Sequence, residues 1–293
     1  MNLATTPNTL TRWTDPNASR EETEERALAV RLSIGERCAA VRKQKENYAA
    51  ALAHLEGVPL PYDCRLPDLE NECVEVERCA WRSFIDDLHL REVLSIAARK
   101  TLDEQLDSQH SYDRSKALPP FEEANVWGFF EQTCRDIPNL IRESLAEVFE
   151  WLTPSKRWTG CKTSNEFEVG EKVVLCFVAE QRYGGGFDVK YRRQGEIDAL
   201  GNALWMLDGR GVRKSEARTP EEAKDCGPYC LAWSEAWKKG EIYEDDFLTA
   251  KAFKNGNAHL TFKRPDIVAK INQAAGEWAL QAAGREKTRG FSY

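Results

Sequence analysis

The sequence contains no long hydrophobic run, and this absence argues against a membrane-spanning protein. Its longest apolar stretches, such as Val173–Ala179, are far shorter than the roughly 20 residues that a transmembrane helix needs. The first 17 residues hold one basic residue and no apolar segment, so we expect no secretory signal. These features predict a protein that stays in the cytoplasm and does not bind a membrane.

Metal and cofactor motifs are also missing. The nine cysteines are an odd number and include no Cys-x-x-Cys pair, the spacing typical of structural zinc. In a chain large enough to fold without disulfides, such cysteines are expected to be reduced thiols, which again favours the cytoplasm. The glycine cluster Gly184–Gly186 is not followed by the Lys-Ser/Thr pair of a phosphate-binding loop. We therefore expect no bound metal ion and no cofactor.

Positive charge is scarce in the chain as a whole but concentrated near its C-terminal end. The formal net charge is −7 and the pI about 5.4, so the molecule as a whole repels polyanions. The segment Phe247–Asn272 nevertheless has a local charge of +4, which leaves −11 for the rest. Any nucleic-acid site must therefore be local, and this segment is where we expect it.

The order of the expected elements indicates an α+β fold, mostly helical in the N-terminal two-thirds, with a small, mostly antiparallel sheet, a hairpin and a helix in the C-terminal part. We expect a disordered tail at 1–18, a helical arm at 19–58, a helical subdomain at 59–153, an α+β domain at 154–284 and a tail at 285–293. Ser19 and Glu22 form a capping-box pattern at the start of the arm. Its buried stripe is predicted to comprise Leu28, Leu32, Ala39, Tyr48, Leu52 and Leu55.

One predicted strand and one predicted hairpin lie in the α+β domain where we expect the binding site. The aliphatic run from Lys172 to Ala179 predicts one strand. Asn255-Gly256 predicts a two-residue type I′ hairpin turn, because both residues tolerate positive φ. Pairing Lys254 with Asn257 would give one apolar face, with Phe247, Phe253, Ala258, Leu260 and Phe262. The opposite face would be small, polar and basic, with Ala250, Ala252, Lys254, Asn257, His259, Thr261 and Lys263.

The hairpin run Phe253–Phe262 and the following Lys263–Asn272 resemble the C-terminal signature of the family named for domain of unknown function 4942. Further similarity is found in Lys162–Val174, Leu204–Gly209, Tyr243–Phe247 and Trp81–Leu106, so that the resemblance covers roughly residues 75–275. It implies a setting on phages, plasmids and integrative elements, where some relatives carry or neighbour a methyltransferase domain. This chain lacks the glycine-rich strand-to-helix turn of such a domain.

The leading hypothesis is a mobile-element-encoded accessory protein that engages nucleic acid, or a host complex that processes nucleic acid, without catalysis. The expected contact residues are Lys251, Lys254, His259, Lys263, Arg264 and Lys270. One alternative is a metal-independent nuclease in which His259 is the general base. Another is an inhibitor that binds a protein of a host defence system through its acidic surface.

Overall fold

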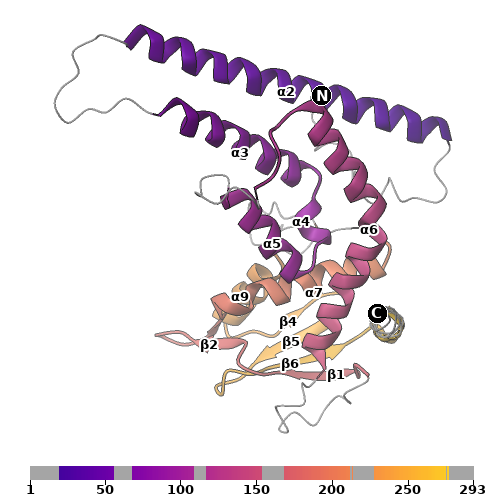
Figure 1. Cartoon of the computed structure of the whole chain (residues 1–293). Helices are drawn as coiled ribbons and strands as arrows, with labels where there is room; N and C mark the ends of the chain where they lie inside the picture. The colour runs from indigo at the N-terminus through magenta and orange to yellow at the C-terminus, as the bar shows by residue number, and fades with distance from the viewer. Residues whose placement is uncertain are drawn as a thin grey trace, which may run out of the picture. The chain divides into compact units, whose positions relative to one another are not determined.

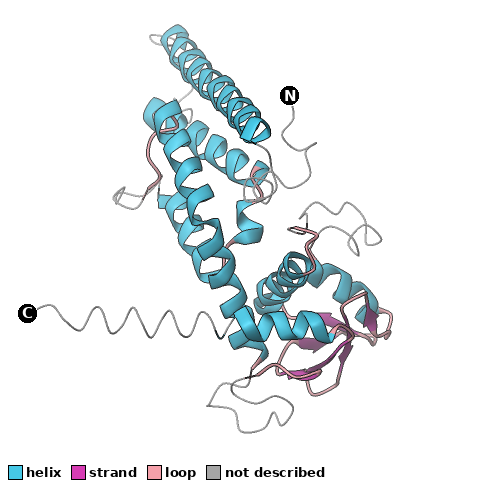
Figure 2. Cartoon of the chain, turned by 90° about the vertical axis from the view of Figure 1, so that its right-hand side faces the viewer, coloured by secondary structure: helices cyan, strands magenta, loops and turns pink. Residues whose placement is uncertain are grey.

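The computed structural model describes residues 20–55, 68–108, 117–153, 168–211, 213, 228–274 and 276. The tails expected at 1–18 and 285–293 lie outside these residues. The predicted α+β fold is confirmed, and every described strand comes after residue 171 (Figures 1 and 2). Among the described helices, none combines the length and the hydropathy of a membrane span.

The chain divides into two compact units. The first contains the residues up to Arg91 and Ala97–Ile137, and the second contains Glu92–Ile96 and Pro138–Tyr293. The division falls inside the helix α6 (Glu123–Leu152), which continues through Pro138, and not at the boundary after residue 153 that the sequence indicated. The reason is that Leu145, Val148 and Leu152 of α6 belong to the core that the sheet builds.

The first unit is helical. Its elements are α2 (Arg20–Leu55), α3 (Leu69–Asp87), the start of α4 (Leu90–Val93), most of α5 (Ile96–Asp107) and the first half of α6. The chain turns between α3 and α4 at His89, whose φ of 53° lies in the left-handed region.

Helix α2 packs lengthwise on α3 (Figure 1). Its buried side chains are Val30, Ile34, Cys38 and Val41, which recur every three or four residues. The predicted stripe was wrong, since Leu28 and Leu32 are 58% and 61% exposed. Ion pairs from Arg37 to Asp87 and from Lys45 to Glu77 flank the buried stripe, so α2 is fastened along its length to α3.

The second unit is built on a four-stranded antiparallel sheet in the order β1-β6-β5-β4. Its strands are β1 (Lys172–Leu175), β4 (Tyr243–Glu244), β5 (Leu248–Ala252) and β6 (Ala258–Phe262). A separate two-stranded ladder pairs β2 (Ala179–Gln181) with β3 (Phe187–Val189). A 3₁₀ turn (Tyr191–Arg193), α7 (Gln194–Leu207), α9 (Tyr229–Lys238) and a helix over 265–274 complete the described part of the unit.

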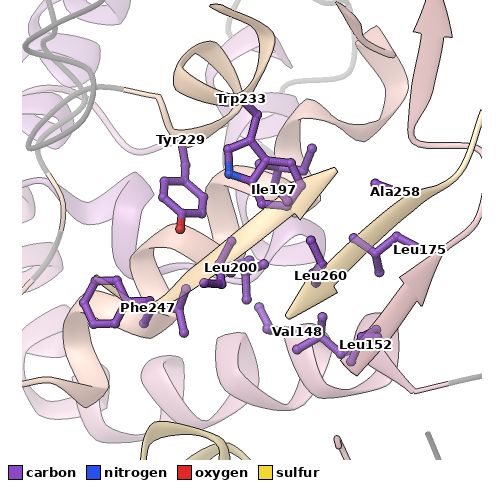
Figure 3. Close-up of a cluster of buried hydrophobic side chains, with 14 of the residues drawn as sticks. Val148, Leu152, Leu175, Ile197, Leu200, Tyr229, Trp233, Phe247, Ala258 and Leu260 are labelled. Atoms are coloured by element: carbon purple, nitrogen blue, oxygen red, sulfur yellow. The ribbon is translucent and has the colours of Figure 1, made fainter. Parts of the chain in front are cut away.

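One face of the sheet is buried by helices. The inward side chains of β1, β5 and β6 pack with α7, α9, the end of α6 and the last helix in a single hydrophobic cluster (Figure 3). Residues alternate between buried and solvent-facing along these strands, as the two-residue period of a half-buried strand requires. The other face of the sheet therefore carries the polar side chains of the strands, and it is this face that offers a binding surface.

Two contacts lock α9 onto α7. The amide N–H of Cys230, at the start of α9, donates to Oδ1 of Asp198 at 2.8 Å, so a side chain of α7 caps α9. Next to it, Gly201 lies so close to Tyr229 that an added Cβ would meet ring atom Cγ at 2.6 Å. Burial, and secondarily Asp198, raises the pKa of the Cys230 thiol, which identifies this cysteine as a packing residue.

The strand predicted over 172–179 is two strands. A turn at Cys176–Phe177 ends β1, and β2 begins at Ala179 in a different sheet. Phe177 has a φ of 57°, which no strand residue adopts, and this backbone reversal could not be inferred from an uninterrupted aliphatic run.

Candidate nucleic-acid interface

The hairpin turn between β5 and β6 has three residues, Lys254–Gly256, and not two. Phe253 N–H donates to Asn257 O at 2.9 Å, and Gly256 N–H donates to Phe253 O at 2.9 Å. Gly256 has a φ of 82°, and Asn255 is not in the left-handed region. This is the pattern of a three-residue loop that ends in a left-handed glycine, and it replaces the predicted type I′ turn.

The extra turn residue shifts β5 by one position and exchanges its two faces. Ala250 and Ala252, predicted to face solvent, lie opposite the inward residues Leu260 and Ala258. Phe253, predicted to be in the core, lies instead on the solvent side. The predicted faces of β6 are confirmed, because Ala258, Leu260 and Phe262 are buried and His259 is exposed.

The corrected register brings a small basic and aromatic cluster together on the solvent side of the hairpin. Lys251 is opposite His259 in the ladder. The ring centroids of His259 and Phe253 are 4.1 Å apart, and Nζ of Lys251 lies 5.3 Å from the centroid of Phe253. Lys254 is exposed in the turn. We call the surface formed by Lys251, Phe253, Lys254, Asn257 and His259 the outer hairpin face.

The turn that separates β1 from β2 adjoins this face. The N–H of Phe177 donates to Oδ1 of Asn257 at 3.3 Å, and Ala179 N–H donates to Gly256 O at 2.9 Å. Nζ of Lys190 lies 5.6 Å from the ring centroid of Phe177, within cation–π range. Phe177 and Lys190 therefore extend the outer hairpin face, although the sequence did not single them out.

The other three expected contact residues are engaged elsewhere. Nζ of Lys263 pairs with Glu244 at 2.6 Å and donates to the carbonyl oxygen of Asp245 at 2.6 Å. Nζ of Lys270 donates to the carbonyl oxygen of Leu207, the last residue of α7, at 2.7 Å. These lysines stabilise the connections around the far end of the sheet, so the structure does not gather all six predicted residues into one site.

Arg264 is held by two carboxylates. Its Nη2 lies 2.7 Å from Asp266 Oδ2 and 3.1 Å from Asp208 Oδ1. Hydrogen bonds to Asp266 raise the pKa of Arg264, and the same guanidinium lowers the pKa of Asp266 to about 2. A guanidinium whose single charge is already shared between two carboxylates attracts a phosphate only weakly.

The carboxylate of Asp245 holds the start of β5 in place, because both of its oxygens accept hydrogen bonds. Its Oδ1 accepts the amide protons of Phe247 and Leu248, both at 2.8 Å, while Oδ2 accepts the hydroxyls of Tyr229 and Tyr243. Burial is the main cause that raises the pKa of both tyrosines, so they remain neutral donors. This network anchors the strand that carries Lys251 to the buried core.

His259 lies beside an aromatic ring and opposite a lysine. Within the described part of the chain, no carboxylate hydrogen-bonds to its imidazole, which lies against the Phe253 ring. General acid–base cleavage of a phosphodiester uses two positioned proton-transfer groups, and beside His259 the outer hairpin face offers lysines for the second role and no carboxylate. The same residues do suit a nucleic acid, since cations pair with phosphates and aromatic rings stack on bases.

Comparison with protein families agrees with the resemblance noted in the sequence. The model of the family described as "Domain of unknown function (DUF4942)" matches residues 73–279. The chain belongs to this family. The match includes the outer hairpin face, Phe177 and Lys190, and it begins after α2. No curated protein and no solved structure matches the chain.

Proposed function

We propose that this DUF4942 protein engages nucleic acid, without catalysis, through the outer hairpin face. The observation that carries the proposal is the cross-strand arrangement in which Lys251 and His259 both contact Phe253 on the solvent side of the sheet. Such a surface offers cations to phosphates and a ring to a base at the same place. The setting on mobile genetic elements is part of the proposal and rests on the family resemblance.

The charge distribution supports attraction of nucleic acid to one local surface and not to the molecule as a whole. The chain has a net charge of −7, so the contact must be made where lysines stand free of carboxylates. Lys263 and Arg264 do not meet this condition, because each is paired with a carboxylate. Lys251 and Lys254 are exposed, and neither has a carboxylate partner among the described residues. They are the residues that we expect to release counterions on binding.

The experiment is a salt titration of binding to DNA and RNA oligonucleotides. Replacing both lysines (Lys251→Ala with Lys254→Ala) should weaken binding and reduce the slope of log K against log salt by up to about two. The matched control replaces two exposed cations of the first unit, Arg42→Ala with Lys43→Ala, which changes the net charge equally. The proposal fails if both double variants lose the same affinity, or if the wild-type chain binds no nucleic acid at about 50 mM salt.

A further inference from the structure

Phe177 combines features that ordinary packing does not explain. Its φ of 57° belongs to the left-handed region, where a bulky side chain is disfavoured and glycine is preferred. Its side chain is also not buried, since the residue is 46% exposed. The phenyl ring therefore gains little from the core while its backbone is strained.

The surroundings hold this residue in place. Asn257 accepts the Phe177 N–H, and the Ala179 N–H donates to Gly256 O, so the turn is tied to the hairpin on both sides of Phe177. A glycine at position 177 would make the same backbone hydrogen bonds with less strain. Strained residues that the neighbouring structure holds in place occur preferentially at ligand sites. The ring itself is thus the feature that needs a function.

The charges around Phe177 indicate an anionic ligand with a planar group. Lys190 lies over the ring, and Lys251 and Lys254 follow on the outer hairpin face. Glu180 and Asp188 are opposite each other on the β2–β3 ladder and would repel phosphates there. The path open to a phosphate chain therefore runs from Lys190 to the outer hairpin face.

We propose that Phe177 is a stacking platform for an unpaired base, so that the nucleic acid engaged by this chain is single-stranded. The proposal rests on the function proposed above and specifies its ligand. Bases in a duplex are already stacked on their neighbours, whereas those of a single strand can stack on an aromatic side chain. Lys190 and the outer hairpin face hold the flanking phosphates.

The test compares the full chain and its variants on one oligonucleotide of about 20 nucleotides, single-stranded or annealed to its complement. We expect the single strand to bind at least about tenfold more tightly than the duplex. Phe177→Leu should lower single-strand affinity by about tenfold, and Phe177→Trp should restore it. Phe177→Gly should lose affinity to a similar extent while its thermal stability is unchanged or raised, because the backbone strain is relieved.

The matched control is His89→Gly, which relieves the other positive φ at a non-glycine residue described in the chain and lies in the first unit. It should leave single-strand affinity unchanged. Equal affinity for single strand and duplex, with no effect of Phe177→Leu, would overturn this inference and leave the proposed function standing. A loss of stability in Phe177→Gly would also overturn it, by showing that the ring is a packing residue. Absence of binding to either nucleic acid would overturn both.

Discussion

The imidazole of His259 lies against the phenyl ring of Phe253, with centroids 4.1 Å apart and planes inclined by 38°. Phe253 directly follows β5 and His259 belongs to β6, and the two rings lie on the same side of the hairpin because its turn has three residues. The same register places Lys251 opposite His259. The outer hairpin face therefore contains one ring pair and two exposed lysines. Lys263 and Arg264, which are paired with carboxylates, lie outside it.

The first prediction concerns the chemistry of His259. Because no carboxylate among the described residues hydrogen-bonds to the His259 imidazole to activate it as a base, we expect that the wild-type chain does not cleave a labelled oligonucleotide in the absence of metal. His259→Ala should accordingly show the same background rate, measured on denaturing gels with chelator present. If the wild-type chain does cleave and His259→Ala slows cleavage by roughly 100-fold, the imidazole is a general base and the non-catalytic account is wrong.

The second prediction concerns Arg264 and pH. Asp266 has a folded-state pKa of about 2, below its value in an unfolded chain, so the pair stabilises the fold above about pH 4 and this contribution is lost as the pH falls toward 2. Thermal unfolding should show Arg264→Ala to be less stable than wild type at pH 7, with a gap that narrows on acidification. The effect should be small, since both groups are exposed to solvent.

The same variant also gives a prediction for nucleic-acid binding. Arg264→Ala should keep wild-type affinity for nucleic acid, because the guanidinium is committed to Asp266 and Asp208. Lys100→Ala, which removes another exposed cation near a carboxylate in the first unit, is the control for a general change in charge. A drop in affinity in Arg264→Ala as large as that in the Lys251 and Lys254 double variant would contradict this division of roles.

The third prediction concerns the packing of α7 against α9. Gly201→Ala would place a Cβ 2.6 Å from Cγ of Tyr229, so we expect the free energy of unfolding to fall by about 1–3 kcal/mol. Gly195→Ala is the matched control on the same helix, since a Cβ there meets nothing within 4 Å. It should be neutral or stabilising by up to about 1 kcal/mol. Urea unfolding curves that are equal for the two variants would argue against the close contact.

The sequence predicted the parts of the fold that depend on local patterns. The alternation of Ala258, Leu260 and Phe262 identified the buried face of β6. The turn was harder, because Asn255-Gly256 fits both a two-residue and a three-residue loop, and one residue decides which face of β5 is buried. In α2, the leucines that were predicted to be buried and the residues that are buried recur with the same helical period. Only the position of α3 decides which of the two sets is buried.

The site was only partly predictable for a related reason. Lys251, Lys254 and His259 are close in sequence, and local charge was enough to identify them. Arg264 has one carboxylate partner two residues away, Asp266, but its second partner Asp208 lies more than 50 residues away, as does the Leu207 carbonyl that accepts from Lys270. These two distant contacts follow from the tertiary structure alone. Phe177 was hidden in an aliphatic run, and its role depends on a backbone angle that composition does not reveal.

We expect nucleic acid to contact the outer hairpin face and the adjoining Phe177. This expectation is tested most directly by ultraviolet crosslinking of the full chain to a photoreactive single-stranded oligonucleotide, followed by mass spectrometric localisation of the crosslinked residues. The account predicts crosslinks in the peptides that contain Phe177 and Phe253, and their loss on competition with unlabelled oligonucleotide. Crosslinks confined to the first unit, or none that a competitor removes, would contradict it.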